Sequence, residues 1–170
     1  VMRSIDVEFL HPAQYLAEIE IRTWVSDFQR VRSHREYEAW RVNDNTLLVR
    51  ARVDWVHLDR ATFAPKRVPQ QMGDVFAPNG KPALAPMQWR DMTEGESLGH
   101  YASTRRVQQY ELDQMQHVNN TVYVNWIEQQ MHEAWRAWGR DSAGLNVHRH
   151  FVEYRQQAVG DDELRLASDA

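Results

Sequence analysis

The stretch YELDQMQHVNNTVYVNWIEQQ, residues 110–130, decides the fold of this 170-residue chain. Its second half carries apolar residues at helical spacing, and its first half concentrates carboxylates, an imidazole and two amides. An asparagine at that junction is a favourable N-cap, because its side chain can accept a hydrogen bond from an unpaired amide of the first turn. We therefore predict a helix over residues 121–138, capped by Asn119 or Asn120. Gly139 then takes the position that follows the C-cap.

The first third of the chain has the alternating pattern of antiparallel strands. Ile5, Val7 and Phe9 alternate with polar residues, and similar runs occupy residues 19–23, 31–41 and 47–58. The turn signal at residues 42–45 predicts a hairpin between the last two runs. The alternating charges of QRVRSHR, residues 29–35, are interpreted as the exposed face of a strand and not as a track for phosphates.

Residues 61–99 hold all but one of the six prolines. This composition predicts an extended, partly polyproline-like linker. Since linkers of this length are uncommon inside compact domains, the segment is expected to join two structural units. A strand over residues 103–110 should follow it, and a last strand region should run over residues 147–166.

An internal repeat relates EFLHPAQYLAEIEI, residues 8–21, to EYRQQAVGDDELRL, residues 153–166. At one constant offset both copies show a glutamate followed by an aromatic residue, and then an alanine, a second glutamate and two aliphatic residues. The first copy has no strand and helix before it, and the second has no sheet after it. We therefore expect halves of two units, completed either by a second chain or by further sequence.

Composition excludes several classes of function. Apolar residues make up 42% of the chain and the net charge is −4, so a core can form but no basic field for nucleic acid exists. The absence of cysteine excludes disulfides, cysteine nucleophiles and thiolate metal sites. His148 and His150 lack a third ligand, so we predict no metal and no cofactor. No membrane-spanning run or secretory signal is visible, which makes a cytoplasmic location the default expectation.

The pattern D-x-x-x-H-V-N-N-x-x-Y-x-x-W, followed by a long helix, resembles the hotdog fold of acyl thioesterases. Residues 111–128 are most similar to the acyl-acyl-carrier-protein thioesterase family, whose members carry two hotdog units in tandem. EYRQ at residues 153–156 and the stretch RARVDWVHLDRATFAPKRVPQQM at residues 50–72 also match this family.

The resemblance implies an α+β fold in which a curved antiparallel sheet wraps a long central helix. The chain would hold parts of two tandem hotdog units. Residues 1–72 would be the C-terminal sheet portion of the first, residues 73–102 a linker, and residues 103–170 the N-terminal strand–helix–strand portion of the second.

The resemblance also implies a catalytic site around Asp113, His117 and Asn119. Asp113 would act as general base on water or as nucleophile, and His117 would share proton transfer or polarise the carbonyl. The positive end of the helix and its amides would stabilise the oxyanion. The alternatives are a loop aspartate that caps a turn and a histidine held by the backbone, while Asn119 serves as a cap and orients the aspartate.

Further residues are implied to contact the substrate, and two positions depart from the family pattern. Met115 stands where the family has an asparagine, and Gln157 stands where it has a glutamate. These departures would suit a slow enzyme, an arrangement centred on Asp113, or a protein that binds acyl groups without hydrolysing them. The implied substrate-binding residues are Asn120, Thr121, Tyr123, Trp126 and Gln157.

The function implied is hydrolysis of fatty acyl thioesters of acyl carrier protein or coenzyme A. Two alternatives are a non-catalytic acyl-binding or assembly module and a dehydratase of the hotdog class, since dehydratases also use a histidine and a carboxylate. Because hotdog sheets pair side by side, the expected partner is a second copy or a complementary hotdog unit.

Overall fold

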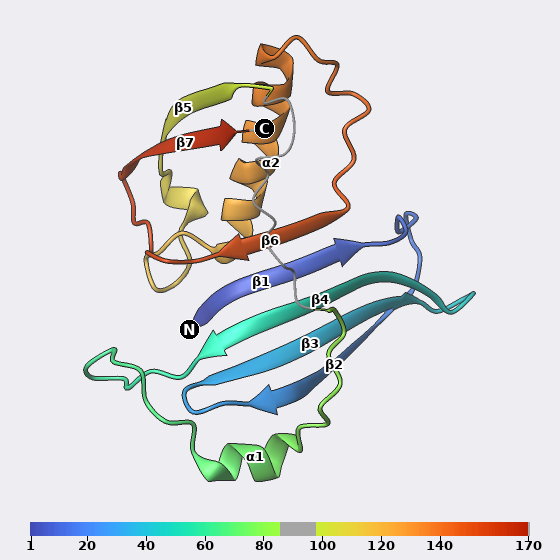
Figure 1. Ribbon diagram of the computed structural model, residues 1–170, viewed down its shortest axis with the longest axis vertical. Helices are drawn as coiled ribbons and strands as arrows, with labels where there is room; N and C mark the ends of the chain where they lie inside the picture. Colours follow the sequence, from blue (N-terminus) through green and yellow to red (C-terminus); the bar gives the residue numbers. More distant parts are fainter. Residues whose placement is uncertain (86–97, 170) are drawn as a thin grey trace. The chain divides into compact units, whose positions relative to one another are not determined.

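The computed structural model describes residues 1–85 and 98–169 (Figure 1). Contacts divide the chain into two compact units. The first unit combines residues 1–88 with residues 147–155, and the second combines residues 89–146 with residues 156–170. The predicted division at residues 1–72, 73–102 and 103–170 stays a prediction.

The first unit is built on a five-stranded antiparallel sheet (Figure 1). Its predicted hairpin is confirmed, because β3 and β4 pair around a tight turn in which Asn45 has a φ of 52°. Asparagine tolerates this left-handed conformation better than most residues. The strands in spatial order are β2 (Ile19–Phe28), β3 (Arg32–Arg41), β4 (Thr46–Val56), β1 (Met2–Phe9) and β6 (Arg149–Glu153).

The two copies of the sequence repeat have the same order of elements. Each begins with a strand, β1 or β6, and continues through a loop into a second strand, β2 or β7 (Glu163–Asp169). The two opening strands pair with each other in the sheet, with Ile5 opposite Val152. The predicted strand region over residues 147–166 therefore consists of two strands that belong to different units.

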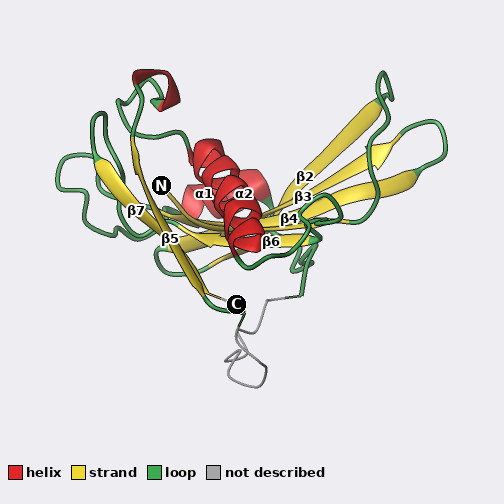
Figure 2. Ribbon diagram, turned by 90° about the horizontal axis from the view of Figure 1, so that it is seen from above, coloured by secondary structure: helices red, strands yellow, loops and turns green. Residues whose placement is uncertain are grey.

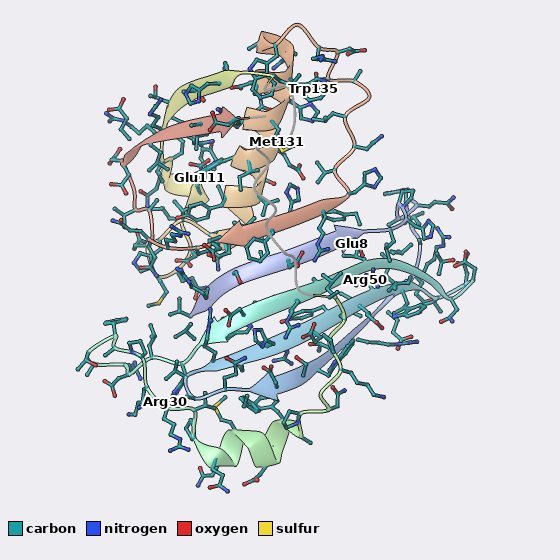
Figure 3. The ribbon with its side chains drawn as sticks, viewed as in Figure 1. Glu8, Arg30, Arg50, Glu111, Met131 and Trp135 are labelled. Carbon is teal, nitrogen blue, oxygen red and sulfur yellow. The ribbon has the colours of Figure 1, made fainter. Side chains whose placement is uncertain are left out.

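In the stretch 29–35, residues 29–30 are exposed and residues 31–35 are half-buried, and the charged face of the sheet holds a buried residue immediately after it. Glu36 on β3 is fully buried, and it accepts hydrogen bonds from the Ser26 hydroxyl and the Ala83 amide. Leu84, which follows Ala83, is 2% exposed. Segment 79–85 therefore covers part of this face. Figure 3 labels two residues that form an ion pair in this sheet, Arg50 on β4 and Glu8 on β1. The Arg50 guanidinium donates a hydrogen bond to the Glu8 carboxylate.

The linker prediction is wrong in one respect, because a short helix, α1 (Gln70–Phe76), interrupts the extended chain. It follows Pro69, and proline is well tolerated where a helix begins. The Phe76 ring packs 6.4 Å from the Phe28 ring of β2, so tertiary contact supports the helix. Residues 86–97 of the predicted linker lie outside the described residues.

The second unit places one long helix, α2 (Asn120–Ala137), against a two-stranded antiparallel sheet of β5 (His100–Arg106) and β7 (Figure 2). The predicted helix is confirmed within a residue at each end. Asn119 is its N-cap, and Gly139 follows the C-cap with a φ of 73°. The predicted strand over residues 103–110 begins at His100 and gives way to a 3-10 turn, η1 (Gln109–Glu111).

The core of the second unit lies between α2 and the segments that precede and follow it. Leu112, Val122, Tyr123, Leu164 and Leu166 pack around its four buried members. Those members are Val107, Val118, Trp126 and Ala158. Within residues 1–85 and 98–169, no helix combines the length and the apolar character that crossing a membrane requires.

Candidate active site

A short loop, residues 112–118, brings Asp113 and His117 together immediately before α2. Leu112 and Val118 form an antiparallel bridge at its base. Above that bridge the Asp113 amide donates a 2.8 Å hydrogen bond to the His117 carbonyl. Gln116 closes the turn with a φ of 61°. The loop is therefore a small closed hairpin with Asp113 and His117 at its neck.

The Asp113 side chain caps this loop. Its Oδ1 accepts hydrogen bonds from the Met115 amide at 2.8 Å and from the His117 amide at 3.3 Å. Aspartate often holds a turn in this way, by bonding to backbone amides a few residues ahead. Oδ2 accepts no hydrogen bond from the part of the chain that the structure describes. The capping alternative is thus present in the structure, and it engages Oδ1.

Asn119 acts as the cap of α2. Its Oδ1 accepts a 3.0 Å hydrogen bond from the Thr121 amide and a 2.9 Å bond from the Thr121 hydroxyl. The Val122 amide donates to the Asn119 carbonyl at 2.9 Å. Two amides of the first turn are therefore engaged within the cap. The positive end of the helix dipole still lies beside the Asp113 loop, with the half-buried Asn120 as the first helical residue.

The loop that carries Gln157 lies alongside the Asp113 loop. The Val118 amide donates a 2.9 Å hydrogen bond to the Ala158 carbonyl, and His117 forms a bridge with Val159. Gln157 is exposed and His117 is half-buried. The structure thus brings together two segments that the sequence separates by the whole of α2.

Tyr123 and Trp126 are placed in the core. The Tyr123 hydroxyl accepts a 2.9 Å hydrogen bond from the Ala158 amide, and its ring lies 5.1 Å from the Trp126 ring. Trp126 is 4% exposed. These contacts fix α2 against its neighbours, and a substrate contact by either residue stays a prediction.

Met115 lies at the tip of the loop and is 70% exposed. The family's asparagine at this position would offer a polar group at the tip. In this chain the tip offers a thioether, which is at best a weak hydrogen-bond acceptor.

Glu111 is the residue of this region that sequence reasoning missed. It is 5% exposed, and its carboxylate accepts hydrogen bonds from the Arg105 guanidinium, the Trp126 indole and the Gln108 amide. The Gln108–Glu111 spacing is that of a capping box, a pattern that could have indicated the bond to Gln108. Nothing in the sequence indicates that the carboxylate is buried.

The environment of Glu111 shifts its acid strength. Burial acts to raise the pKa of the Glu111 carboxyl, but the Gln108 amide, the Trp126 indole and the Arg105 charge together outweigh burial. The pKa therefore lies below its ordinary value of 4.5. Glu111 is consequently ionised at neutral pH.

This shift makes stability depend on pH. Because the folded-state pKa is the lower one, the unfolded chain takes up the proton more readily, and the stabilisation by Glu111 is lost as the pH falls from its ordinary pKa through the folded-state value. We expect the urea midpoint of wild type to fall more steeply between pH 7 and about pH 3 than that of Glu111→Gln. Glu163→Gln, which changes an exposed carboxylate of the same unit, is the control and should follow wild type. Equal slopes for wild type and Glu111→Gln would contradict the expectation.

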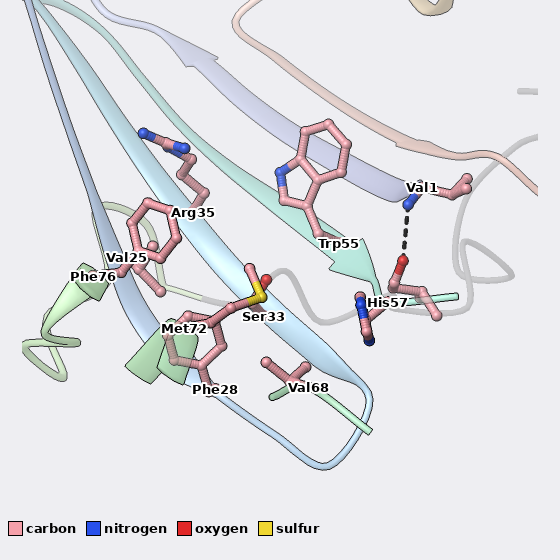
Figure 4. A pocket seen from close by; sticks show the side chains of 11 residues that line it. Val1, Val25, Phe28, Ser33, Arg35, Trp55, His57, Val68, Met72 and Phe76 are labelled. Atoms are coloured by element: carbon pink, nitrogen blue, oxygen red, sulfur yellow. Dashed lines mark hydrogen bonds between the residues drawn. The ribbon is translucent and has the colours of Figure 1, made fainter. Parts of the chain in front are cut away.

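The described residues hold no group of three or more metal-ligating side chains within reach of one ion. A cavity of about 330 Å³ lies within the first unit, beside α1 (Figure 4). Its walls are mostly apolar, and none of the predicted site residues lines it. It is lined by Val1, Val25, Phe28, Ser33, Arg35, Trp55, Val56, His57, Val68, Met72 and Phe76.

The antiparallel sheets, the long helix and the loop at its start define a protein of the hotdog fold. The chain belongs to the acyl-ACP thioesterase family. Residues 1–76 match the model of the acyl-ACP thioesterase N-terminal domain, and residues 98–138 match that of the C-terminal domain. Together the two regions cover more than half of the chain.

Individual proteins are similar to this chain in sequence or in fold. A chloroplastic palmitoyl-acyl carrier protein thioesterase from Arabidopsis thaliana is 26% identical over 113 residues, which are 64% of this chain and 27% of that protein. The 12:0-ACP thioesterase from Umbellularia californica superposes with a TM-score of 0.73 at 18% identity, over 97% of this chain and 63% of that one. An acyl-ACP thioesterase from Bacteroides thetaiotaomicron gives 0.71 at 18% identity, over 96% and 62%. The chain thus spans about a quarter of the curated relative and less than two thirds of the solved structures.

Proposed function

We propose that this chain is part of an acyl thioesterase that hydrolyses fatty acyl thioesters. The observation that carries the proposal is the loop in which Asp113 and His117 meet at the start of α2, in a member of the acyl-ACP thioesterase family. The names of two similar proteins, which act on palmitoyl-acyl carrier protein and 12:0-acyl carrier protein, favour acyl carrier protein over coenzyme A as the carrier. A role in fatty acid biosynthesis and a cytoplasmic location belong to the same proposal.

The mechanism proceeds by attack of water on the thioester carbonyl. The Oδ2 atom of Asp113 accepts a proton as the water oxygen bonds to the carbonyl carbon. The carbonyl oxygen then carries negative charge, which the positive end of α2 stabilises. The carbon–sulfur bond breaks, and the thiolate takes up the proton, with His117 sharing its transfer. Asn119, Asn120 and Thr121 hold the helix start in place.

A second candidate is an acyl-binding module without catalysis. Gln157 presents an amide that cannot act as a base, and Met115 places a thioether at the loop tip. If the family's asparagine and glutamate prepare the water, this chain lacks both. Asp113 would then remain as a loop cap only, as its bonds to the Met115 and His117 amides allow.

Assembly with a complementary hotdog unit is part of the proposal. The second unit covers an 18-residue helix with only two described strands, and Ile127 on that helix is 37% exposed. Two strands form a marginal sheet by themselves. Light scattering of the purified chain should therefore give the mass of a dimer or of a complex, and the mass of a monomer would count against assembly.

A thiol-release assay with a panel of acyl-carrier-protein and coenzyme A thioesters tests the function. Hydrolysis above the rate of a blank, with a preference for one chain length, is the expected result. Mass spectrometry of co-purified ligand is run beside it. A bound acyl group without thiol release would establish the binding module instead. The absence of both release and ligand would reject the two candidates together.

A further inference from the structure

We propose that Glu111 is a positioning residue, whose carboxylate fixes the Asp113–His117 loop against the start of α2. The kinetic part of this inference rests on the proposed function. The structural part, which concerns the rigidity of the loop, does not. Figure 3 shows Glu111 beside α2 in the second unit.

The carboxylate of Glu111 joins three elements. Its Oε1 accepts hydrogen bonds from Arg105 at the end of β5 and, at 2.9 Å, from the indole of Trp126 on α2. Its Oε2 accepts a 2.8 Å bond from the Gln108 amide ahead of η1. A single buried side chain therefore holds the strand, the turn and the helix at fixed mutual distances.

The backbone of Glu111 holds the loop itself. Its carbonyl accepts a 3.0 Å hydrogen bond from the amide of Asn119, the N-cap of α2. Residues 111 and 119 thus form the last rung below the Leu112–Val118 bridge. Both ends of the loop meet at the residue whose side chain is anchored in the core, so a shift of Glu111 would move the loop relative to the helix.

The charged and aromatic groups around the Glu111 carboxylate also fix its orientation. The Arg105 guanidinium lies 4.2 Å from the centre of the Trp126 ring while it donates to Glu111, so the acid, the arginine and the indole constrain one another. Buried ion pairs contribute little net stability compared with apolar packing of the same volume. Their hydrogen bonds do fix orientation, and a displacement of about 1 Å in a catalytic group can cost about a hundredfold in rate.

The test compares Glu111→Gln with a control in the same unit, Gln130→Met. Gln130 is 4% exposed and bonds to Ser103 on β5 and to the Leu166 carbonyl on β7, so its replacement loosens α2 without touching the loop. Hydrogen exchange of the Met115, His117 and Asn119 amides is measured in both variants at matched global stability. We expect exchange about tenfold faster or more in Glu111→Gln than in Gln130→Met.

Kinetics provide a second readout. In Glu111→Gln, kcat for thioester hydrolysis should fall by about tenfold or more with KM near the wild-type value, because the substrate-binding surface is kept while the general base Asp113 moves. Equal exchange of the loop amides in the two variants would overturn the proposal. A wild-type chain without thioesterase activity would reject the proposed function, and the exchange result would still decide the role of Glu111.

A milder variant keeps the test decisive if Glu111→Gln fails to fold. Trp126→Phe removes one donor to Glu111 and leaves the Arg105 pair in place. The same three amides should then exchange faster than in Gln130→Met, by a smaller factor. Exchange no faster than in the control would again reject the inference.

Discussion

The Asp113→Asn variant is expected to lose about a hundredfold or more in kcat for thioester hydrolysis while it keeps its fold. Asparagine retains an oxygen that can accept the hydrogen bonds of the Met115 and His117 amides. The substitution therefore preserves the cap of the loop and removes only the negative charge. General bases contribute about 10² to 10⁴ in rate, which sets the expected loss. A thiol-release assay under saturating substrate measures it.

The chain offers a matched control in Asp141. Its Oδ1 also accepts a hydrogen bond from a backbone amide two residues ahead, that of Ala143, at 2.9 Å, and Asp141 is exposed. Asp141→Asn changes the same charge in the same kind of turn, and kcat should stay at the wild-type value. Full activity of Asp113→Asn would remove Asp113 from the mechanism and leave it as a loop cap.

Trp126→Ala is expected to lower the free energy of unfolding by about 3–5 kcal/mol, the usual range for removal of a large aromatic side chain from a core. Trp126 is 4% exposed and packs with Val107, Val118 and Ala158. Its removal leaves a cavity and takes one donor from the buried Glu111 carboxylate. Urea unfolding followed by circular dichroism measures the change.

Trp126→Phe separates packing from hydrogen bonding. Phenylalanine keeps most of the ring and loses the indole donor, so a smaller loss of about 1–2 kcal/mol is expected. If Trp126→Ala cost less than about 1 kcal/mol, the residue would not be part of the core. The prediction that Trp126 contacts substrate would then gain support.

Local signals in the sequence were sufficient to predict α2. The asparagine at residue 119 caps the start of the helix, and the glycine at residue 139 allows the chain to turn after its end. Both residues lie next to the ends that they determine, so the ends can be predicted from the nearby sequence. The strands of the first unit likewise follow from alternation. The short helix α1 and the covering of Glu36 by segment 79–85 could not be predicted, because both depend on contacts between residues far apart in the sequence.

The candidate site likewise has some features that neighbouring residues determine and others that depend on packing between distant residues. The D-x-x-x-H pattern indicated Asp113 and His117 as candidate site residues. The structure brings their backbones together at the neck of one loop. Spacing alone could not show that Asp113 caps that loop. It also could not show that Glu111, two residues earlier, is the buried carboxylate with three donors. Carboxylates two residues apart look alike in a sequence, and only packing shows that Glu111 is buried while Asp113 is half-buried.

Segment 79–85 has a consequence for how the sheet can polymerise. The amides of Asn79 and Gly80 donate to the carbonyls of Val25 and Ser26 on β2, which is one outer strand of the five-stranded sheet. That part of β2 cannot also bond to a strand of another molecule. Edge-to-edge addition of another strand is therefore blocked at residues 25 and 26. Segment 79–85 thereby opposes strand addition along this part of the sheet edge.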